Sequence, residues 1–217
     1  TTQKLDERSK YKIRKSPTFL KDVVDPDEDL MRYAVGNAWN NLKYFKDPSA
    51  QVRRAALENK GWAIQYLKNP TEEEKLIAVG RDADAIQYIE SPSCQVQMAA
   101  VDSAWNAIKL IKDPCAEAKR VAIQKNEQAI AYIKDYTPEE MAGYLKENIN
   151  IVKYVYDSLD MDELTRVLTE VFAGETTMDY IRAFMELQIL DIDKIPFIDG
   201  VGSKSTKEML VDYVLGR

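Results

Sequence analysis

The sequence contains no histidine, and this absence removes the most common general base, the imidazole metal ligands and the usual physiological pH switch. It also lacks any apolar run near the roughly 18 residues that a membrane-spanning helix needs, and its N-terminus has no apolar signal-peptide core. No pair of carboxylates recurs at a spacing that would support general acid–base catalysis. We therefore expect a non-enzymatic, cytoplasmic protein without a cofactor, a metal site or a membrane contact.

The sequence is instead dominated by a repeat of 22 residues that begins at Asp25 and runs to Lys134. Five copies open on a dipeptide that ends in proline. Because the first residue of such a dipeptide can cap a helix and proline suits the first helical turn, each opening predicts a helix start. The openings are Asp25-Pro26, Asp47-Pro48, Asn69-Pro70, Ser91-Pro92 and Asp113-Pro114, followed by a degraded Asp135-Tyr136.

Each copy carries two apolar patterns that predict a helix, a turn and a second, shorter helix. Glu28 and Glu72 are expected to complete capping boxes with Asp25 and Asn69. A helix pair of this size cannot bury its apolar face alone, so consecutive copies must stack. We predict an all-α fold, an α-solenoid of about six 22-residue helix-turn-helix repeats with a C-terminal helical cap or module. The small and aliphatic pairs that would form the packing ridge are Ala34-Val35, Ala56-Leu57, Ala78-Val79, Ala100-Val101 and Ala122-Ile123.

The repeat register divides the chain into three predicted parts. Residues 1–24 carry seven Lys and Arg against three Asp and Glu, a net charge of +4, and form a basic N-terminal arm or cap. Within this arm we expect residues 1–15 to be mobile and residues 16–20 to cover the exposed face of the first repeat. The helical-repeat solenoid is expected over residues 25–156 and a C-terminal helical module over residues 157–217.

The two cysteines, Cys94 and Cys115, lie next to the prolines that open two successive copies. This placement could bring them near one another on the edge formed by the turns. Because nothing in the sequence indicates export, we predict two free thiols in a reducing cytoplasm.

A glycine-containing stretch near the C-terminus resembles the helix-hairpin-helix motif of DNA-binding proteins. A hydrophobic-Gly-hydrophobic-Gly turn leads into a helix expected from about Ser203 to Leu215. The resemblance implies backbone N–H groups that face a phosphate, with charge added by lysines. The alternative is an interhelical turn that merely needs two glycines. The residues implied in phosphate or nucleic-acid binding are Gly200, Val201, Gly202, Ser203, Lys204 and Lys207.

Two columns of side chains along the repeats are candidates for protein binding. Trp39 and Trp105 share one repeat position, Trp62 lies one residue off it, and a tyrosine recurs at the end of the second helix. Such rings can grip a partner or stack on bases, or they can bury their bodies between helices. The other column could form a partly basic stripe or a solvated face, and its cations are Arg53, Arg54, Lys119 and Arg120.

The amino-acid sequence of the copies resembles a short helical-repeat family of unknown function from phages, giant viruses and amoeba-associated bacteria. That family reads approximately Val-x-x-Ala-Ala-Val followed by Asn-Gly-x-Ala-Leu/Ile-x-Tyr, and the stretches from Val52 to Tyr66 and from Val96 to Val101 are similar to it. The resemblance covers about residues 25–156. It implies a helical-repeat fold and a viral or phage source, but no activity. The copies are also similar, more loosely, to HEAT-like and leucine-rich-variant repeats, which are mostly binding scaffolds.

Two functions follow as expectations. The first is a non-enzymatic scaffold that binds another protein, a host or viral component, through the repeat surface. The second is a nucleic-acid-binding protein that applies the glycine turn and the basic arm to DNA or RNA. Strong salt dependence of binding would favour the second function, and protein binding that survives loss of residues 157–217 would favour the first.

Overall fold

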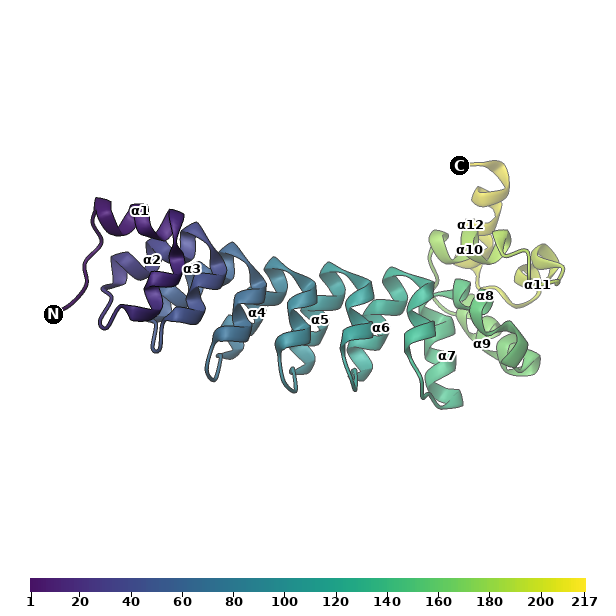
Figure 1. Ribbon diagram of the computed structural model, residues 1–217. Helices are drawn as coiled ribbons and strands as arrows, with labels where there is room; N and C mark the ends of the chain where they lie inside the picture. Colours follow the sequence, from purple (N-terminus) through teal and green to yellow (C-terminus); the bar gives the residue numbers. More distant parts are fainter. The chain divides into compact units, whose positions relative to one another are not determined.

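The computed structural model describes all 217 residues, and every regular element in it is a helix (Figure 1). The fold is an all-α solenoid of helix-pair repeats, as the 22-residue spacing predicts. By its internal contacts the chain divides into two compact units, residues 1–118 and residues 119–217. None of the helices is both long enough and apolar enough to cross a bilayer.

The first unit begins with an ordered helical cap. The helix α1 (Glu7–Lys15) buries Ile13, and the 3₁₀-helix η1 (Pro17–Asp22) buries Leu20. Both elements contact the first repeat. The prediction that residues 16–20 cover this repeat is therefore confirmed, because η1 contains most of them. The prediction that residues 1–15 are mobile is wrong, because a capping box and a buried isoleucine hold most of this segment as a helix.

Each of the first five repeats consists of an α-helix of ten residues and a shorter second helix of 3₁₀ type, whereas the second helix of the sixth copy is divided into short 3₁₀ and α segments. The α-helices are α2 (Glu28–Asn37), α3 (Ala50–Asn59), α4 (Glu72–Arg81), α5 (Cys94–Ser103), α6 (Ala116–Lys125) and α7 (Pro138–Glu147). The six-residue 3₁₀-helices are η2 (Trp39–Tyr44), η3 (Gly61–Tyr66), η4 (Ala83–Tyr88), η5 (Trp105–Leu110) and η6 (Glu127–Tyr132).

The helix starts lie two residues later than the Asp-Pro reading predicts. Asn69 and Ser91 have positive φ values of 45° and 48°, a turn conformation and not that of an N-cap. The predicted boxes on Glu28 and Glu72 are therefore wrong, and a complete capping box instead joins Thr71 to Glu74, as another does in the sixth copy. The side chains that cap the repeat helices belong to the residues after the turns, namely Asp27, Ser49, Thr71, Ser93 and Thr137.

The predicted packing ridge is the core of the repeats. All of its small and aliphatic pairs, from Ala34-Val35 to Ala122-Ile123, have no exposed side-chain surface. Burying each aliphatic member contributes on the order of 1.5–3 kcal/mol. The approach between neighbouring repeats is close enough that a Cβ atom at Gly61 would lie 2.2 Å from the carbonyl oxygen of Ala78. Glycine is therefore required where η3 meets α4.

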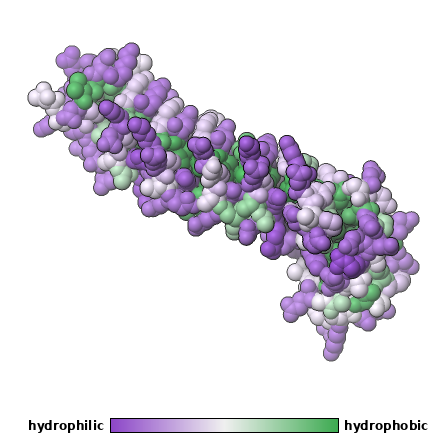
Figure 2. Space-filling model, turned by 90° about the horizontal axis from the view of Figure 1, so that it is seen from below, coloured by the Kyte–Doolittle hydropathy of each residue, from purple (hydrophilic) through white to green (hydrophobic).

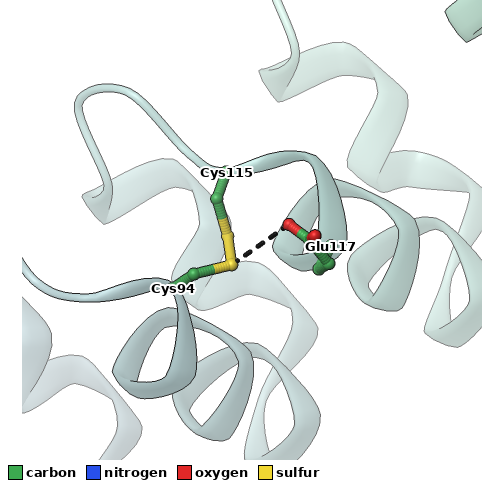
Figure 3. A group of neighbouring side chains, drawn as sticks. All are labelled: Cys94, Cys115 and Glu117. Atoms are coloured by element: carbon green, nitrogen blue, oxygen red, sulfur yellow. Dashed lines mark hydrogen bonds between the residues drawn. A yellow bond between two sulfur atoms is a disulfide. The ribbon is translucent and has the colours of Figure 1, made fainter.

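A disulfide joins Cys94 to Cys115, so the prediction of two free thiols is wrong (Figure 3). Stacking of the repeats brings the two Cα atoms to 5.8 Å, a separation that a disulfide spans without backbone movement. Glu117 Oε2 lies 3.2 Å from Cys94 Sγ. These three residues are close enough to share a metal ion, but both sulfur atoms are committed to the disulfide.

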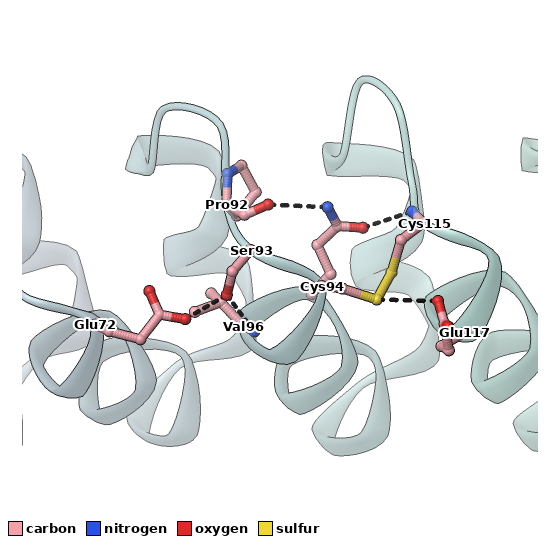
Figure 4. Close-up of a disulfide and its surroundings, with 8 residues drawn as sticks. Glu72, Pro92, Ser93, Cys94, Val96, Cys115 and Glu117 are labelled. Carbon is pink, nitrogen blue, oxygen red and sulfur yellow. Dashed lines mark hydrogen bonds between the residues drawn. A yellow bond between two sulfur atoms is a disulfide. The ribbon is translucent and has the colours of Figure 1, made fainter.

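The disulfide occupies a position that other repeats fill with a hydrogen bond. Ser49 Oγ donates to Glu28 Oε1 at 3.1 Å, and Ser93 Oγ donates to Glu72 in the same register. Cys115 follows Ser93 by 22 residues, and Cys94 follows Glu72 by the same number. Figure 4 shows the Ser93–Glu72 hydrogen bond beside the disulfide. At the same repeat position, the starts of successive repeat helices are thus linked by a Ser–Glu hydrogen bond in some copies and by a disulfide in another.

The second unit ends in helices that carry no repeat register. Phe172 packs against Phe184 and Phe197 with ring centroids 5.0 and 6.3 Å away. The hydroxyl group of Tyr180 donates to the carbonyl oxygen of Leu145 at 2.7 Å, and burial raises the pKa of this tyrosine. The helices after the sixth copy are η7 (Ile149–Ile151), α8 (Val152–Val155), η8 (Tyr156–Ser158), α9 (Met161–Ala173), α10 (Met178–Glu186), α11 (Lys194–Val201) and α12 (Lys204–Leu215).

Candidate protein-binding surface

The 3₁₀-helices of the first unit carry pairs of aromatic rings that connect one repeat to the next. Trp39 stacks on Tyr66 with ring centroids 6.0 Å apart, and Trp62 meets Tyr88 edge-on at 5.7 Å. All four side chains are only partly buried. We call each tryptophan–tyrosine pair an aromatic rung. The rungs place part of each ring between the helices, as the burial alternative predicts, and leave the remainder accessible to a partner.

Polar contacts hold the second rung in place. The indole N–H of Trp62 donates to Asp84 Oδ1 at 2.8 Å, and Lys60 Nζ lies 4.9 Å from the centre of the Trp62 ring. Lys60 also pairs with Asp82 at 3.2 Å, and the other oxygen of Asp82 accepts a hydrogen bond from the Gly61 N–H at 2.7 Å. A ring that is fixed in this way loses little side-chain entropy when a partner packs on it.

The next interface, between η4 and η5, has no rung. Two repeats after Trp39 and Tyr66 the same positions hold Ala83 and Leu110. A groove of about 540 Å³ opens there, and we call it the open groove. Its apolar lining comes from Ala83, Ala104, Ala107 and Leu110, and its polar lining from Arg81, Asp82, Asp84, Gln87, Ser103, Asn106 and Lys109.

The predicted basic column lies in ion pairs along the repeats. Arg53 forms a bidentate pair with Glu74 at 2.7 and 2.8 Å, and Arg54 contacts Glu58 at 2.8 Å and Glu73 at 3.2 Å. Burial would raise the pKa of Glu74, but its hydrogen bonds from Arg53 and from the Thr71 N–H lower it. In the second unit, Lys119 lies 4.0 Å from Glu140, and Arg120 lies 2.7 Å from Glu147. These contacts account for the four cations as links along the solenoid, and a role in binding stays a prediction.

The glycine stretch forms a tight connection between two helices. Gly200 and Val201 lie in the last turn of α11, Gly202 ends that helix, and Ser203 caps α12. The N–H groups of Gly202 and Ser203 donate to the carbonyl oxygens of Ile198 at 2.7 Å and Phe172 at 2.8 Å. A Cβ atom on Gly202 would lie 2.6 Å from the same Ile198 oxygen, so a close backbone approach explains this glycine.

The two lysines of this stretch, Lys204 and Lys207, are exposed on the first turn of α12. With two of the hairpin N–H groups already donating inside the protein, the phosphate contact that the resemblance implies would depend on these lysines and on the first turn of α12. Phosphate binding at this place stays a prediction.

A small apolar pocket of about 220 Å³ lies in the second unit and is lined by residues of α7, α9 and the chain between them. Its acidic members are Asp160, which caps α9, and Glu163, which pairs with Arg166 at 2.9 Å. Both carboxylates therefore already have structural partners. We assign this pocket no function.

Figure 2 shows hydrophilic side chains over most of the face that it presents, with smaller hydrophobic patches between them. Trp39, Trp62 and Trp105 are partly buried at the start of η2, η3 and η5, so the structure brings the predicted tryptophans onto the second helices of successive copies. Sequence reasoning missed Asp84 and the open groove. Aligned copies would have shown the groove as the copy in which the aromatic positions hold Ala83 and Leu110.

No protein-family model, no curated protein and no solved structure matches this chain.

Proposed function

We propose that this chain is a non-enzymatic scaffold that binds another protein through the 3₁₀-helices η2 to η5 of the first unit. The observation that supports this function most is the presence of two partly exposed aromatic rungs, the second anchored by polar contacts, next to the open groove. Tryptophan and tyrosine are enriched among the side chains that dominate binding energy at protein interfaces. The resemblance of the copies to viral and phage repeats makes a host or viral protein the class of partner we propose.

The charge of this surface favours a protein over a nucleic acid. Asp82 and Asp84 lie beside Lys60 and Trp62, and a surface that binds phosphates carries an excess of cations. Cations of the N-terminal cap are also engaged within the protein. Arg14 donates to the Tyr33 hydroxyl at 2.7 Å, and Lys10 pairs with Glu7 at 3.1 Å.

The proposed function is tested by selecting short random peptides on the full chain and mapping where they bind. We expect the selected peptides to protect the backbone amides of η2 to η5 from hydrogen exchange. They should bind at least about tenfold more weakly to the Trp62→Ala variant, since the loss of a hot-spot ring costs more than about 1.4 kcal/mol. Tyr154→Ala, which removes an exposed tyrosine of the second unit, is the matched control and should leave binding unchanged.

Protection confined to other parts of the chain would overturn the proposed surface. The nucleic-acid function is tested in parallel by titrating fluorescent DNA and RNA at two salt concentrations. Binding that weakens with salt and is lost in a folded Gly202→Asp/Lys204→Glu variant would replace a protein with a nucleic acid as the partner.

A further inference from the structure

The open groove differs from its neighbours by what is missing from it. At the η2–η3 interface Trp39 and Tyr66 fill the space between successive 3₁₀-helices, and at the η3–η4 interface Trp62 and Tyr88 do so. The η4–η5 interface joins 3₁₀-helices of the same six-residue length as those at the other two interfaces. The groove of about 540 Å³ opens at this interface, where the residues in the register of Trp39 and Tyr66 are Ala83 and Leu110.

The residues around the groove indicate which side chain would fill it. In the second rung the indole N–H of Trp62 finds its acceptor at Asp84, and the residue 22 positions after Asp84 is Asn106. Asn106 is exposed at the groove, and its amide oxygen can accept a hydrogen bond as the Asp84 carboxylate does. Leu110, which follows Tyr88 by 22 positions, offers an apolar side chain where the rung has its second ring.

We propose that the open groove binds a tryptophan side chain of the protein partner, which completes the missing rung. The indole ring lies against Ala83, Ala107 and Leu110, and its N–H donates to the Asn106 amide oxygen. This inference rests on the proposed function, and it names the anchor residue that the partner supplies. The lining of the groove has no net charge, because its two cations, Arg81 and Lys109, equal in number its two carboxylates, Asp82 and Asp84. An uncharged ring therefore meets no net charge there.

The test uses the full chain labelled with ¹⁵N and N-acetyl-L-tryptophanamide as the probe. We expect saturable amide shifts at Ala83, Asn106 and Leu110 with a Kd on the order of 1 mM, as is usual for a ligand of this size. N-acetyl-L-leucinamide should bind at least about fivefold more weakly, since it lacks the ring. Shifts scattered over the surface, or equal affinity for the two probes, would overturn the proposal.

Two variants make the result specific to the groove. Ala83→Trp/Leu110→Tyr rebuilds the rung in the register of Trp39 and Tyr66. This variant should fold, should melt at a higher temperature and should no longer bind the probe. Asn106→Ala should weaken binding about three- to tenfold by removing one hydrogen bond. Asn40→Ala, at the same repeat position in η2, is the control and should change nothing.

Each outcome decides the matter. Undiminished binding by the folded double variant overturns the proposal, and if the double variant does not fold, equal affinity of Asn106→Ala and Asn40→Ala overturns it. Selected peptides that protect η2 to η5 while the probe fails to enter the groove would refute this inference alone. Absence of any peptide that protects these helices would refute the proposed function itself.

Discussion

The repeats of the first unit and the helices α9 to α12 of the second unit build their hydrophobic cores from different side chains. The repeats bury small pairs such as Ala56-Leu57 at every interface, whereas the last helices combine buried aliphatic side chains with one cluster of rings around Phe172. In the repeats one position therefore has several equivalents, and a change at any copy can be judged against its neighbours. The cluster around Phe172 has no equivalent, so its structure offers no internal comparison.

This difference shows where a function can be recognised. A Ser–Glu hydrogen bond and a disulfide occupy the same register at the helix starts, so this position tolerates a change of chemistry. The aromatic rungs recur at two successive interfaces and are absent at a third, and that absence leaves a groove. A copy that carries a different residue at one repeat position is informative, because the neighbouring copies show which side chain packs at that position elsewhere.

The largest effect is expected in the region without repeats. Phe172→Ala removes the ring at the centre of the second unit's aromatic cluster and should lower the free energy of unfolding by about 3–5 kcal/mol. Urea denaturation followed by circular dichroism measures this loss. A loss below about 1 kcal/mol would show that the cluster does not hold α9 to α12 together.

The disulfide offers a sharper test within the repeats. Cys94→Ser/Cys115→Ser should reduce stability by about 3 kcal/mol relative to the oxidised protein, since the bond closes a loop of 21 residues in the unfolded chain. Cys94→Glu/Cys115→Ser recreates the Glu72–Ser93 pair in its own register and should recover about 0.5–1.5 kcal/mol of that loss. Thermal melting of the three proteins, with and without reductant, checks both values. Equal melting temperatures of the two variants would contradict the equivalence of the register.

Close approach of the repeats is tested by Gly61→Ala. The new Cβ atom would clash with the Ala78 carbonyl oxygen, so we expect a loss of about 1–3 kcal/mol from displaced backbone. Gly80→Ala is the control, because a Cβ atom there meets nothing within 4 Å and alanine is the better helix former. It should be neutral or stabilising by up to about 1 kcal/mol. A stable Gly61→Ala protein would show that the repeats are further apart than described.

The smallest effect concerns pH and the Arg53–Glu74 ion pair. The pKa of Glu74 in the folded protein lies below its ordinary value of 4.5, so the carboxylate stabilises the fold above pH 4.5 and this contribution is lost as the pH falls through the folded pKa. Urea unfolding should show a shallower decline below about pH 4.5 for Glu74→Gln than for the wild type. Parallel declines in the two proteins would mean that the ion pair contributes nothing to stability.

The 22-residue period and the small apolar pairs predicted the solenoid because they recur in successive copies. An ambiguous helix signal in one copy is therefore supported by the same signal in the others. The helix starts were misplaced because a better capping residue directly follows the dipeptide that ends in proline, as Ser49 and Thr71 show. The disulfide was missed because free thiols were predicted from the lack of any sign of export, whereas only stacking fixes the 5.8 Å between the Cα atoms of Cys94 and Cys115. The tryptophans of the candidate surface were predicted, but the open groove depends on which rings meet across an interface.

The central claim is that the η4–η5 interface lacks a rung which a partner's indole ring completes. Intermolecular nuclear Overhauser effects between N-acetyl-L-tryptophanamide and the full chain test this claim most directly. We predict contacts from the indole protons to the methyl groups of Ala83, Ala107 and Leu110. Contacts to Tyr66 and Tyr88 in place of these methyl groups, or none at saturation, would contradict it.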